Sequence, residues 1–251
     1  MRNNSLRRKR HAGEPVYGAW VTLESANVTE ACVASGVDWV VIEMEHGHLD
    51  WRDVANHVRA TAGTDTAALI RIPDTQRSFV QRALDIGADG VICPMIGSRE
   101  ELEAAFQFGR FPPRGVRGVG GERSVKWGLE WDSYLKNANV NTWIIPLLET
   151  RAAVDNIDSI LDVDGLELIF FGPADLSASF GFLGQWEGPG VAEAILAMRA
   201  KAVSRGISTG ILARSSDEAM MRREQGFQMI GLGADVNLML RSLQHSLDLL
   251  R

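Results

Sequence analysis

The chain alternates between short apolar segments and helix-like segments along most of its length. The apolar segments are continuous rather than alternating, which is typical of parallel strands covered on both faces. Eight of them occur, at Val16–Val21, Trp39–Ile42, Thr66–Arg71, Asp89–Pro94, Thr142–Glu149, Leu166–Gly172, Ile207–Leu212 and Phe227–Leu232. This regular recurrence constrains the possible folds more than any other feature.

Helix signals fill the spaces between these segments. Ser25, Ser98 and Ser215 stand where helix caps are expected, and Gly36 and Gly87 stand just past two predicted helix ends. Eight strand–helix units in 251 residues predict an α/β fold, a single (β/α)8 TIM-barrel domain spanning 1–251. A doubly wound open sheet is the main alternative, but no G-x-G-x-x-G follows the first predicted strand.

One region interrupts this alternation. Residues 111–121 form a Pro/Gly-rich segment, and a polar stretch containing tryptophans follows to Asn141. A long irregular segment inside a compact domain is usually functional. Pro146 is unusual inside the fifth predicted strand, because proline lacks the N–H that a strand donates.

Composition excludes several classes of protein. The net charge of −6 argues against an extended nucleic-acid-binding surface, and the basic run Arg7–His11 is expected to be the solvated face of a short first helix. The sequence contains neither a signal-peptide pattern nor an apolar stretch long enough to span a membrane. Cys32 and Cys93 are too far apart for a C-x-x-C motif, so we expect a cytoplasmic protein.

Ionisable residues gather at the carboxyl ends of the predicted strands. In a barrel these ends converge on one face, where catalytic groups are found. The second strand is followed by an unusually dense group, and later strands contribute an arginine and two acids. These residues are Glu43, Glu45, His46, His48, Arg71, Glu149 and Asp175.

Glu149 and Asp175 suggest a metal site. Each alone could be an acid favoured by a helix N-terminus, but two carboxylates at neighbouring strand ends suit a hard cation such as Mg²⁺ or Mn²⁺. The pair His46 and His48 could instead suggest zinc, but the other histidines stand at predicted helix positions. A neutral histidine acting as a base is the better role for His46.

Two further patterns bear on the chemistry. None of the four lysines ends an apolar segment, and only Lys126, in the irregular region, could form a Schiff base. Backbone N–H groups around Ala174, at a predicted helix start, could bind a substrate carboxylate. Gly118–Gly121 could alternatively hold a phosphate, although it lacks the ending of a P-loop.

The combination resembles the metal-dependent (class II) pyruvate aldolases of the HpcH/HpaI type over nearly the whole chain, from Gly18 to Asp235. The motifs that carry the resemblance are Gly18-Ala-Trp20, Glu45-His-Gly47, Ile70-Arg-Ile-Pro73, Ala83-Leu-Asp-Ile-Gly-Ala88, Pro112-Pro-Arg-Gly-Val-Arg-Gly-Val-Gly120, Glu149-Thr150 and Gly172-Pro-Ala-Asp-Leu-Ser177. It implies a carbon–carbon lyase that reversibly cleaves 4-hydroxy-2-oxo acids to pyruvate and an aldehyde through a metal-bound enolate.

The resemblance also implies roles for individual residues. Glu149 and Asp175 would hold Mg²⁺, Mn²⁺ or Co²⁺. His46 would be the base, acting through metal-bound water, Asp85 would raise its basicity, and Arg71 would stabilise the developing oxyanion. The backbone at Ala174, in the motif that begins with Gly172, would bind the pyruvate carboxylate. Trp20 and Leu212 would line the pocket.

Two positions depart from the family pattern. Glu43, which we count among the catalytic residues, replaces a common aspartate, and Leu147 replaces a common glutamine that contacts pyruvate. The second departure allows a shifted substrate preference. The resemblance further implies a homohexamer, a dimer of trimers, in which the final helix is exchanged between subunits. Alternatives are an oxaloacetate decarboxylase, a citryl-type lyase using the same enolate, or a non-catalytic barrel that binds a small acid.

Overall fold

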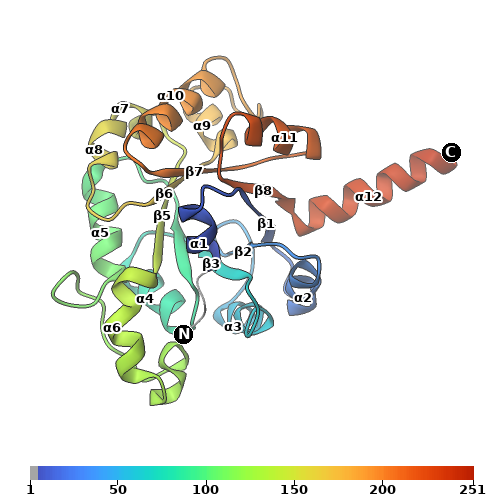
Figure 1. The fold of residues 1–251 in the computed structure, drawn as a ribbon. Coiled ribbons are helices and arrows are strands. Elements are labelled where there is room, and N and C mark those ends of the chain that lie inside the picture. Colours follow the sequence, from blue (N-terminus) through green and yellow to red (C-terminus); the bar gives the residue numbers. More distant parts are fainter. Residues whose placement is uncertain (1–4) are drawn as a thin grey trace.

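The computed structural model describes residues 5–251, and its strands form one closed barrel (Figure 1). All neighbouring strands are parallel and follow one another in chain order, and β8 pairs with β1. The strands are β1 (Val16–Val21), β2 (Trp39–Glu43), β3 (Ala67–Arg71), β4 (Gly90–Cys93), β5 (Trp143–Leu148), β6 (Leu168–Phe171), β7 (Ser208–Leu212) and β8 (Met229–Ala234). The predicted (β/α)8 barrel is therefore confirmed.

Helices precede, surround and follow the barrel. Ser98 and Ser215 cap their helices as predicted, whereas Ser25 stands at the N-cap position without a side-chain hydrogen bond. The helices are α1 (Ser5–His11), α2 (Ala26–Ala34), α3 (Trp51–Ala60), α4 (Arg77–Asp85), α5 (Arg99–Gly109), the 3₁₀ helix η1 (Arg123–Gly128), α6 (Trp131–Asn141), α7 (Arg151–Asp155), α8 (Ile157–Leu161), α9 (Pro173–Ser179), α10 (Val191–Ser204), α11 (Ser216–Glu224) and α12 (Asp235–Leu250).

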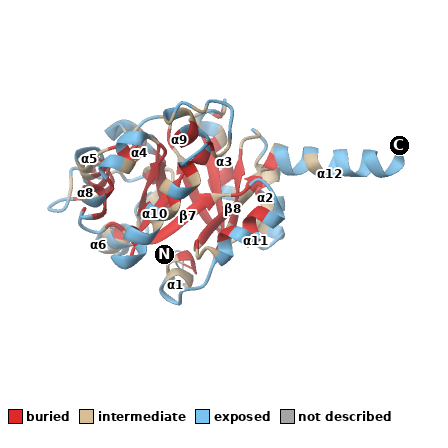
Figure 2. Ribbon diagram, turned by 90° about the horizontal axis from the view of Figure 1, so that it is seen from above, coloured by how far each residue is buried: buried red, intermediate tan, exposed pale blue. Residues whose placement is uncertain are grey.

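The core has two layers, which lie on either side of the strands. The strands themselves are largely buried (Figure 2). The outer layer packs strands against helices, and the inner layer fills the barrel with large side chains such as Trp39, Trp143 and Phe170. Small residues make room for them: a Cβ at Gly18 would lie 2.1 Å from the ring of Trp39. The barrel is thus a packed core, and a ligand is expected to bind beyond the carboxyl ends of the strands rather than inside it.

The N-terminal end of the barrel is covered by α1. Leu6 is buried, the Arg7 guanidinium lies 4.1 Å from the ring centroid of Trp143, and both Arg7 and Arg10 form ion pairs with Glu167. The expected short helix is confirmed. The expectation that its basic residues form a solvated face is wrong for these two arginines, because ion pairs and aromatic contact hold them against the barrel.

The region after residue 121 is more regular than we expected. It contains η1 and α6, so the irregular part is confined to residues 110–122. Trp127 is 69% exposed, whereas Trp143 fills the barrel interior. Pro146 does lie within β5, opposite Cys93 of β4.

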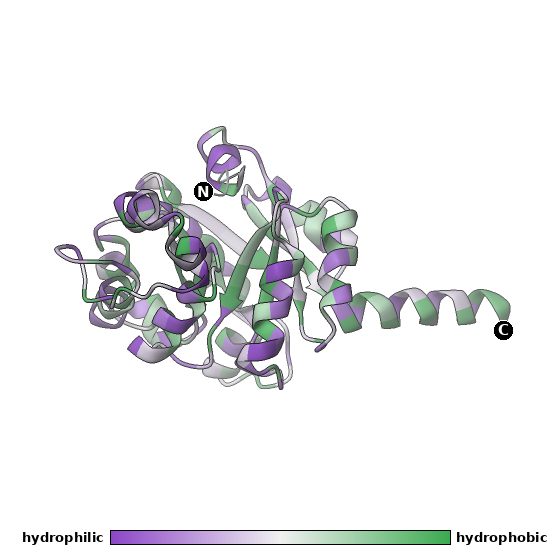
Figure 3. Ribbon diagram, turned by 90° about the horizontal axis from the view of Figure 1, so that it is seen from below, coloured by the Kyte–Doolittle hydropathy of each residue, from purple (hydrophilic) through white to green (hydrophobic). Residues whose placement is uncertain are grey.

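Helix α12 extends away from the barrel (Figure 1). Its first turns are fixed to β8, where Arg241 Nη2 donates to the carbonyl of Leu232 at 3.3 Å. Apolar side chains remain exposed along it, and Figure 3 shows hydrophobic positions over its length. The exposed ones are Leu238, Met239, Leu240, Leu243, Leu247, Leu249 and Leu250.

Candidate active site

A cavity of about 430 Å³ opens at the carboxyl ends of the strands. Most of the predicted site residues line it, together with others that the sequence did not single out. The lining residues are Trp20, Thr22, Leu23, Glu43, His46, Gly47, His48, Arg71, Leu147, Glu149, Phe170, Phe171, Gly172, Pro173, Ala174, Asp175, Trp186, Leu212, Ala234 and Val236.

A larger hollow, of about 870 Å³, lies near the opposite end of the barrel. It is lined by the loops that precede β3 and β4 and by η1 and α6. Its lining includes Asp65, Asp89, Arg123, Lys126 and Glu130, but none of the predicted site residues. Since catalytic groups in barrels occur at the carboxyl ends, the smaller cavity is the candidate active site.

Arg71 is held by two carboxylates. Strand register places Glu43 beside Arg71, and Arg71 Nε lies 2.5 Å from Glu43 Oε2 while Nη1 lies 3.0 Å from Glu45 Oε2. Only 13% of the Arg71 side chain is exposed. The guanidinium is therefore oriented before any substrate binds, as a charge-stabilising group requires.

Glu43 also shapes the loop that carries His46. Its Oε1 accepts hydrogen bonds from the backbone N–H groups of Glu45, at 2.7 Å, and His46, at 3.0 Å. Both Glu43 oxygens are thus occupied, and the residue is 2% exposed. Glu43 consequently positions Arg71 and His46.

His46 projects from this loop into solvent at the edge of the cavity. Its side chain is 66% exposed, and Nε2 lies 3.9 Å from Glu45 Oε2. Burial raises the pKa of Glu45, although Arg71 and His46 oppose that shift. The sequence placed Glu45 at this strand end but assigned it no role.

Glu149 is a buried carboxylate at the end of β5. Burial raises its pKa to about 8; the Met95 N–H, which donates to Oε1 at 2.9 Å, opposes the rise, and Asp175 and Glu45 add to it. Met95 adopts a φ of 57°, which is uncommon for a residue other than glycine. The ionised form of Glu149 is therefore disfavoured unless positive charge lies nearby.

Gly172 keeps space open beside Glu149. A Cβ at this position would lie 2.4 Å from Glu149 Oε2, so any side chain would displace that oxygen. Asp175 follows in the first turn of α9, where the N–H groups of Ala174 and Asp175 precede the first intrahelical bond, donated by Leu176. The segment from Gly172 to Asp175 thus leaves room beside the Glu149 carboxylate, supplies the Asp175 carboxylate and presents backbone N–H donors.

These two carboxylates fit a hard divalent cation. Oxygen donors suit Mg²⁺ or Mn²⁺, which commonly retain water and substrate as further ligands. Positive charge between Glu149 and Asp175 would offset both the burial of Glu149 and the repulsion between the two acids. Within residues 5–251 no group of three or more His, Cys, Asp and Glu could hold a metal, so a zinc site built on His46 and His48 is not found.

Asp85 lies outside the cavity. It ends α4, and its Oδ1 lies 2.8 Å from Nη2 of the fully buried Arg117. Arg117 also contacts the rings of Phe111 and Tyr134. The other predicted site residues line the cavity, but one copy of the chain does not bring Asp85 to it.

The remaining walls are apolar. Trp20 packs against Trp39 and Phe170, and Leu147 and Leu212 also line the cavity. The sequence did not predict a role for Trp186, which comes from the loop after α9. No strand end or periodic pattern marks that residue, and only the fold brings it to the site.

Three comparisons agree on the family. The family model described as "HpcH/HpaI aldolase/citrate lyase" matches residues 16–242. A "4-hydroxy-2-oxovalerate aldolase" of Rhodococcus jostii is 33% identical over 237 residues, which cover 94% of this chain and 92% of that protein. A "hydroxypyruvate/pyruvate aldolase" of Agrobacterium fabrum is 36% identical over 230 residues, covering 90% and 85%.

A solved structure agrees with these sequences. The crystal structure of an HpcH/HpaI aldolase/citrate lyase family protein from Burkholderia cenocepacia has a TM-score of 0.94 and 36% identity, and covers 99% of this chain and 100% of that chain. The expected family and its reaction class, carbon–carbon lyase, are confirmed. The chain belongs to the HpcH/HpaI aldolase/citrate lyase family.

Proposed function

We propose that the protein is a divalent-metal-dependent aldolase that reversibly cleaves 4-hydroxy-2-oxo acids to pyruvate and an aldehyde. The observation that carries this proposal is the convergence of Glu149, Asp175 and the oriented Arg71 on one cavity at the strand ends. The names of the relatives from Rhodococcus jostii and Agrobacterium fabrum support the choice of an aldolase.

Glu149 and Asp175 would hold the cation, which we expect to be Mg²⁺, Mn²⁺ or Co²⁺. When bound, a divalent cation polarises a 2-oxo group and stabilises negative charge that develops on its oxygen. The backbone N–H groups at the start of α9, around Ala174, would bind the substrate carboxylate. Gly172 leaves the space that this arrangement needs.

His46 and Arg71 would act on the reacting atoms. In the cleavage direction His46 accepts the proton of the 4-hydroxyl group while the bond between C3 and C4 breaks, and the bonding electrons pass to the pyruvate half. Arg71 stabilises the resulting oxyanion. Return of this proton from His46 to C3 then completes pyruvate and regenerates the base, and the other fragment leaves as the aldehyde. Glu43 acts by positioning both residues.

We further propose a homohexamer, a dimer of trimers, in which α12 is exchanged between subunits. The exposed leucines of α12 support an interface there, because apolar stripes on isolated helices are normally covered. A proposed role of Asp85 in raising the basicity of His46 then requires a second copy, since one chain does not bring the two together.

We propose one domain over 1–251 and a cytoplasmic location, to which the free thiols Cys32 and Cys93 are suited. Within residues 5–251, none of the helices combines the length and apolar character needed to cross a bilayer.

The test is pyruvate release from a panel of 4-hydroxy-2-oxo acids, before and after EDTA treatment and with Mg²⁺, Mn²⁺ or Co²⁺ added back. We expect activity to disappear with the metal and to return on addition. Turnover of oxaloacetate alone would favour the decarboxylase alternative, and activity that survives complete metal removal would contradict the proposal.

Glu149→Gln provides the matched variant for the metal site. It keeps the size of the side chain and the acceptor for the Met95 N–H, but removes the charge that a cation needs. We expect loss of metal-dependent pyruvate release with an unchanged fold, measured by activity and circular dichroism. A fully active Glu149→Gln enzyme would exclude Glu149 as a metal ligand.

A further inference from the structure

The active-site cavity has two chemically different halves. The groups that would bind the 2-oxo acid come from β2, β3, β5, β6 and the start of α9. The other half is formed by the ends of β7, β8 and β1 with the segments that follow them, and by the loop after α9. Its apolar lining consists of Trp20, Leu23, Trp186, Leu212, Ala234 and Val236. We call this second part the apolar half.

Polar groups at the edge of the apolar half are already bonded within the chain. Thr22 lines the cavity, and its Oγ1 donates to Asp235 Oδ1 at 2.6 Å. The backbone N–H groups of Thr22 and Leu23 donate to Asp235 Oδ2 at 2.9 and 3.0 Å. At the exposed rim, His48 Nε2 lies 3.0 Å from Glu24 Oε1. The Thr22 hydroxyl therefore donates its proton to Asp235 and not to a polar group of a substrate.

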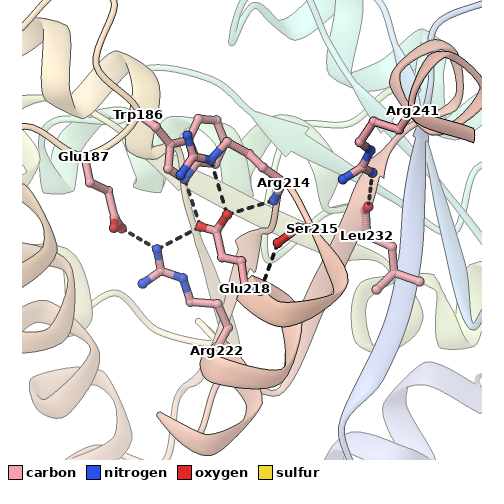
Figure 4. Close-up of polar contacts among 8 residues, drawn as sticks. All are labelled: Trp186, Glu187, Arg214, Ser215, Glu218, Arg222, Leu232 and Arg241. Atoms are coloured by element: carbon pink, nitrogen blue, oxygen red, sulfur yellow. Dashed lines mark hydrogen bonds and ion pairs between the residues drawn. The ribbon is translucent and has the colours of Figure 1, made fainter. Parts of the chain in front are cut away.

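The indole N–H of Trp186 is engaged in the same way. It donates to Glu218 Oε1 at 3.0 Å (Figure 4). The same oxygen accepts from Arg222 Nη2 at 3.1 Å, and Oε2 accepts from the N–H and Nε of Arg214 at 3.0 and 3.2 Å. Burial alone would raise the pKa of Glu218, but these hydrogen bonds outweigh it and lower the pKa. Glu218 is thus an ionised, fully engaged acceptor.

The loop that carries Trp186 is fixed at further points. Arg222, which is fully buried, also donates to Glu187 at 2.5 Å (Figure 4). The N–H of Gly188 donates to Ser177 Oγ at 2.9 Å. The Arg214 guanidinium carbon lies 5.0 Å from the centroid of the Trp186 ring. The indole therefore has a defined position, with its polar edge turned to Glu218 and its ring available to the cavity.

We propose that the apolar half selects an aldehyde with an unsubstituted hydrocarbon tail, and that Trp186 sets this preference. The inference rests on the proposed aldolase function and names its substrate class. A hydroxyl on the tail would lose water and meet donors and acceptors that the chain has already paired. Glu218 is a positioning residue, because it acts on the substrate only through Trp186.

The first experiment compares two substrates of equal carbon number, with Mn²⁺ in excess. 4-Hydroxy-2-oxohexanoate releases pyruvate and propanal, and 4,6-dihydroxy-2-oxohexanoate releases pyruvate and 3-hydroxypropanal. We expect kcat/KM to be about ten- to a hundredfold higher for the unsubstituted tail. Equal or better cleavage of the hydroxylated substrate would overturn the inference while leaving the aldolase function intact. If neither substrate, nor any other in the panel, yields pyruvate, the proposed function itself fails.

The second experiment tests Trp186. We expect Trp186→Ala to reduce the ratio of the two kcat/KM values to about threefold or less, because a tail hydroxyl could then reach water. Trp127→Ala is the matched control: Trp127 is 69% exposed and lies outside the cavity, so the ratio should stay as in the wild type. The same ratio in both variants would exclude Trp186 as the determinant.

The third experiment tests positioning by Glu218. Glu218→Gln retains an acceptor for the indole N–H and should largely keep the wild-type ratio, whereas Glu218→Ala should lower it as Trp186→Ala does. Glu218→Ala leaves Arg222 without its buried partner and could unfold α11.

Trp186→Phe avoids that difficulty, since it removes only the N–H and part of the ring. It should keep a preference for the unsubstituted tail, and a reversed preference would contradict our assignment.

Discussion

At the scale of single residues, Arg71 shows how the barrel prepares its chemistry. Its position opposite Glu43 follows from strand register alone, and Glu45 reaches the same guanidinium from the following loop. Two carboxylates neutralise the arginine and fix its direction, so little reorganisation is needed when charge develops on a substrate. Glu43 keeps the carboxylate of the common aspartate and also holds the loop of His46.

Replacing Arg71 should therefore impair turnover more than binding. We expect Arg71→Ala to lower kcat about 10²- to 10³-fold, the usual cost of removing a donor that stabilises an oxyanion. Arg71→Lys should not restore the rate, because an ammonium group cannot reproduce the two-pronged contact with Glu43 and Glu45. Steady-state kinetics of pyruvate release measure both effects. As a control, Arg99→Ala removes an arginine from a surface i,i+4 pair with Glu103 and should leave kcat unchanged. A near-normal kcat for Arg71→Ala would mean that Arg71 does not take part in the mechanism.

The sequence predicted site residues where local pattern and fold coincide. Glu149 and Arg71 end apolar strands, and the barrel brings such ends together. Trp186 was missed because it lies in a glycine-containing loop, and its approach depends on Glu218, 32 residues later. Arg117, the partner of Asp85, lies in a motif that carries the family resemblance, but the sequence did not indicate this contact. Long-range side-chain contacts of this kind leave no periodic signal.

At the scale of elements, α2 and α3 are joined by a buried polar contact. Thr29 Oγ1 lies 2.8 Å from His57 Nδ1, and neither residue is exposed. Burial lowers the pKa of His57, although Asp53 and Asp235 and the carbonyls of Leu23 and Glu24 oppose the shift. The folded protein therefore favours neutral His57, whereas the unfolded chain protonates it near its ordinary value of about 6.5.

This contact should make stability depend on pH in a defined direction. The folded pKa lies below the unfolded one, so the contribution of His57 is complete above about pH 6.5 and is lost as pH falls towards the folded pKa. We expect the free energy of unfolding, measured with urea, to fall less between pH 8 and pH 5.5 for His57→Gln than for the wild type. An identical pH dependence in the two proteins would contradict a neutral buried His57.

Thr29→Val tests the hydrogen bond without altering His57. It keeps the shape of the side chain and removes the hydroxyl, so we expect a loss of about 1–3 kcal/mol at pH 8. Thr64→Val is the milder control. It removes a hydroxyl that bonds the Thr61 carbonyl in a half-buried turn, and that hydroxyl is not fully buried. Thr150→Val would remove the N-cap of α7 and so tests a different kind of interaction.

Element prediction was reliable where hydrophobic patterns are strong. The eight strands and the helices between them follow continuous apolar runs and caps. Helix α6 was not predicted because its sequence is largely polar and contains asparagines that favour turns over helices. Pro146 lies in β5 despite its missing N–H, and Cys93 stands opposite it in the neighbouring strand.

At the scale of the whole molecule, α12 is the element that the barrel does not cover. Leu240, Leu243, Leu247 and Leu250 recur at intervals of three and four residues and are all exposed. Such spacing places them along one face of the helix. The stripe can be buried only by another surface, and the proposed hexamer supplies one.

Acidic substitutions on this stripe should therefore prevent assembly. We expect Leu243→Glu combined with Leu247→Glu to shift the protein to smaller species in analytical ultracentrifugation, because burying two carboxylates in an apolar interface is costly. His245→Glu places the charge on a face of the same helix away from the stripe, two residues from both Leu243 and Leu247, and should leave the sedimentation coefficient unchanged. A wild-type sedimentation profile for the double variant would mean that α12 does not form the interface.

The placement of α1 has a consequence for how such an enzyme can diversify. Ion pairs of Arg7 and Arg10 with Glu167 secure one end of the barrel, while substrates are expected to enter at the other. Mutations in the cavity wall therefore leave the contacts of α1 at the other end intact. A library that randomises Trp186, Leu212 and Val236 should yield many folded members, so this scaffold is well placed for directed evolution towards new aldehyde acceptors.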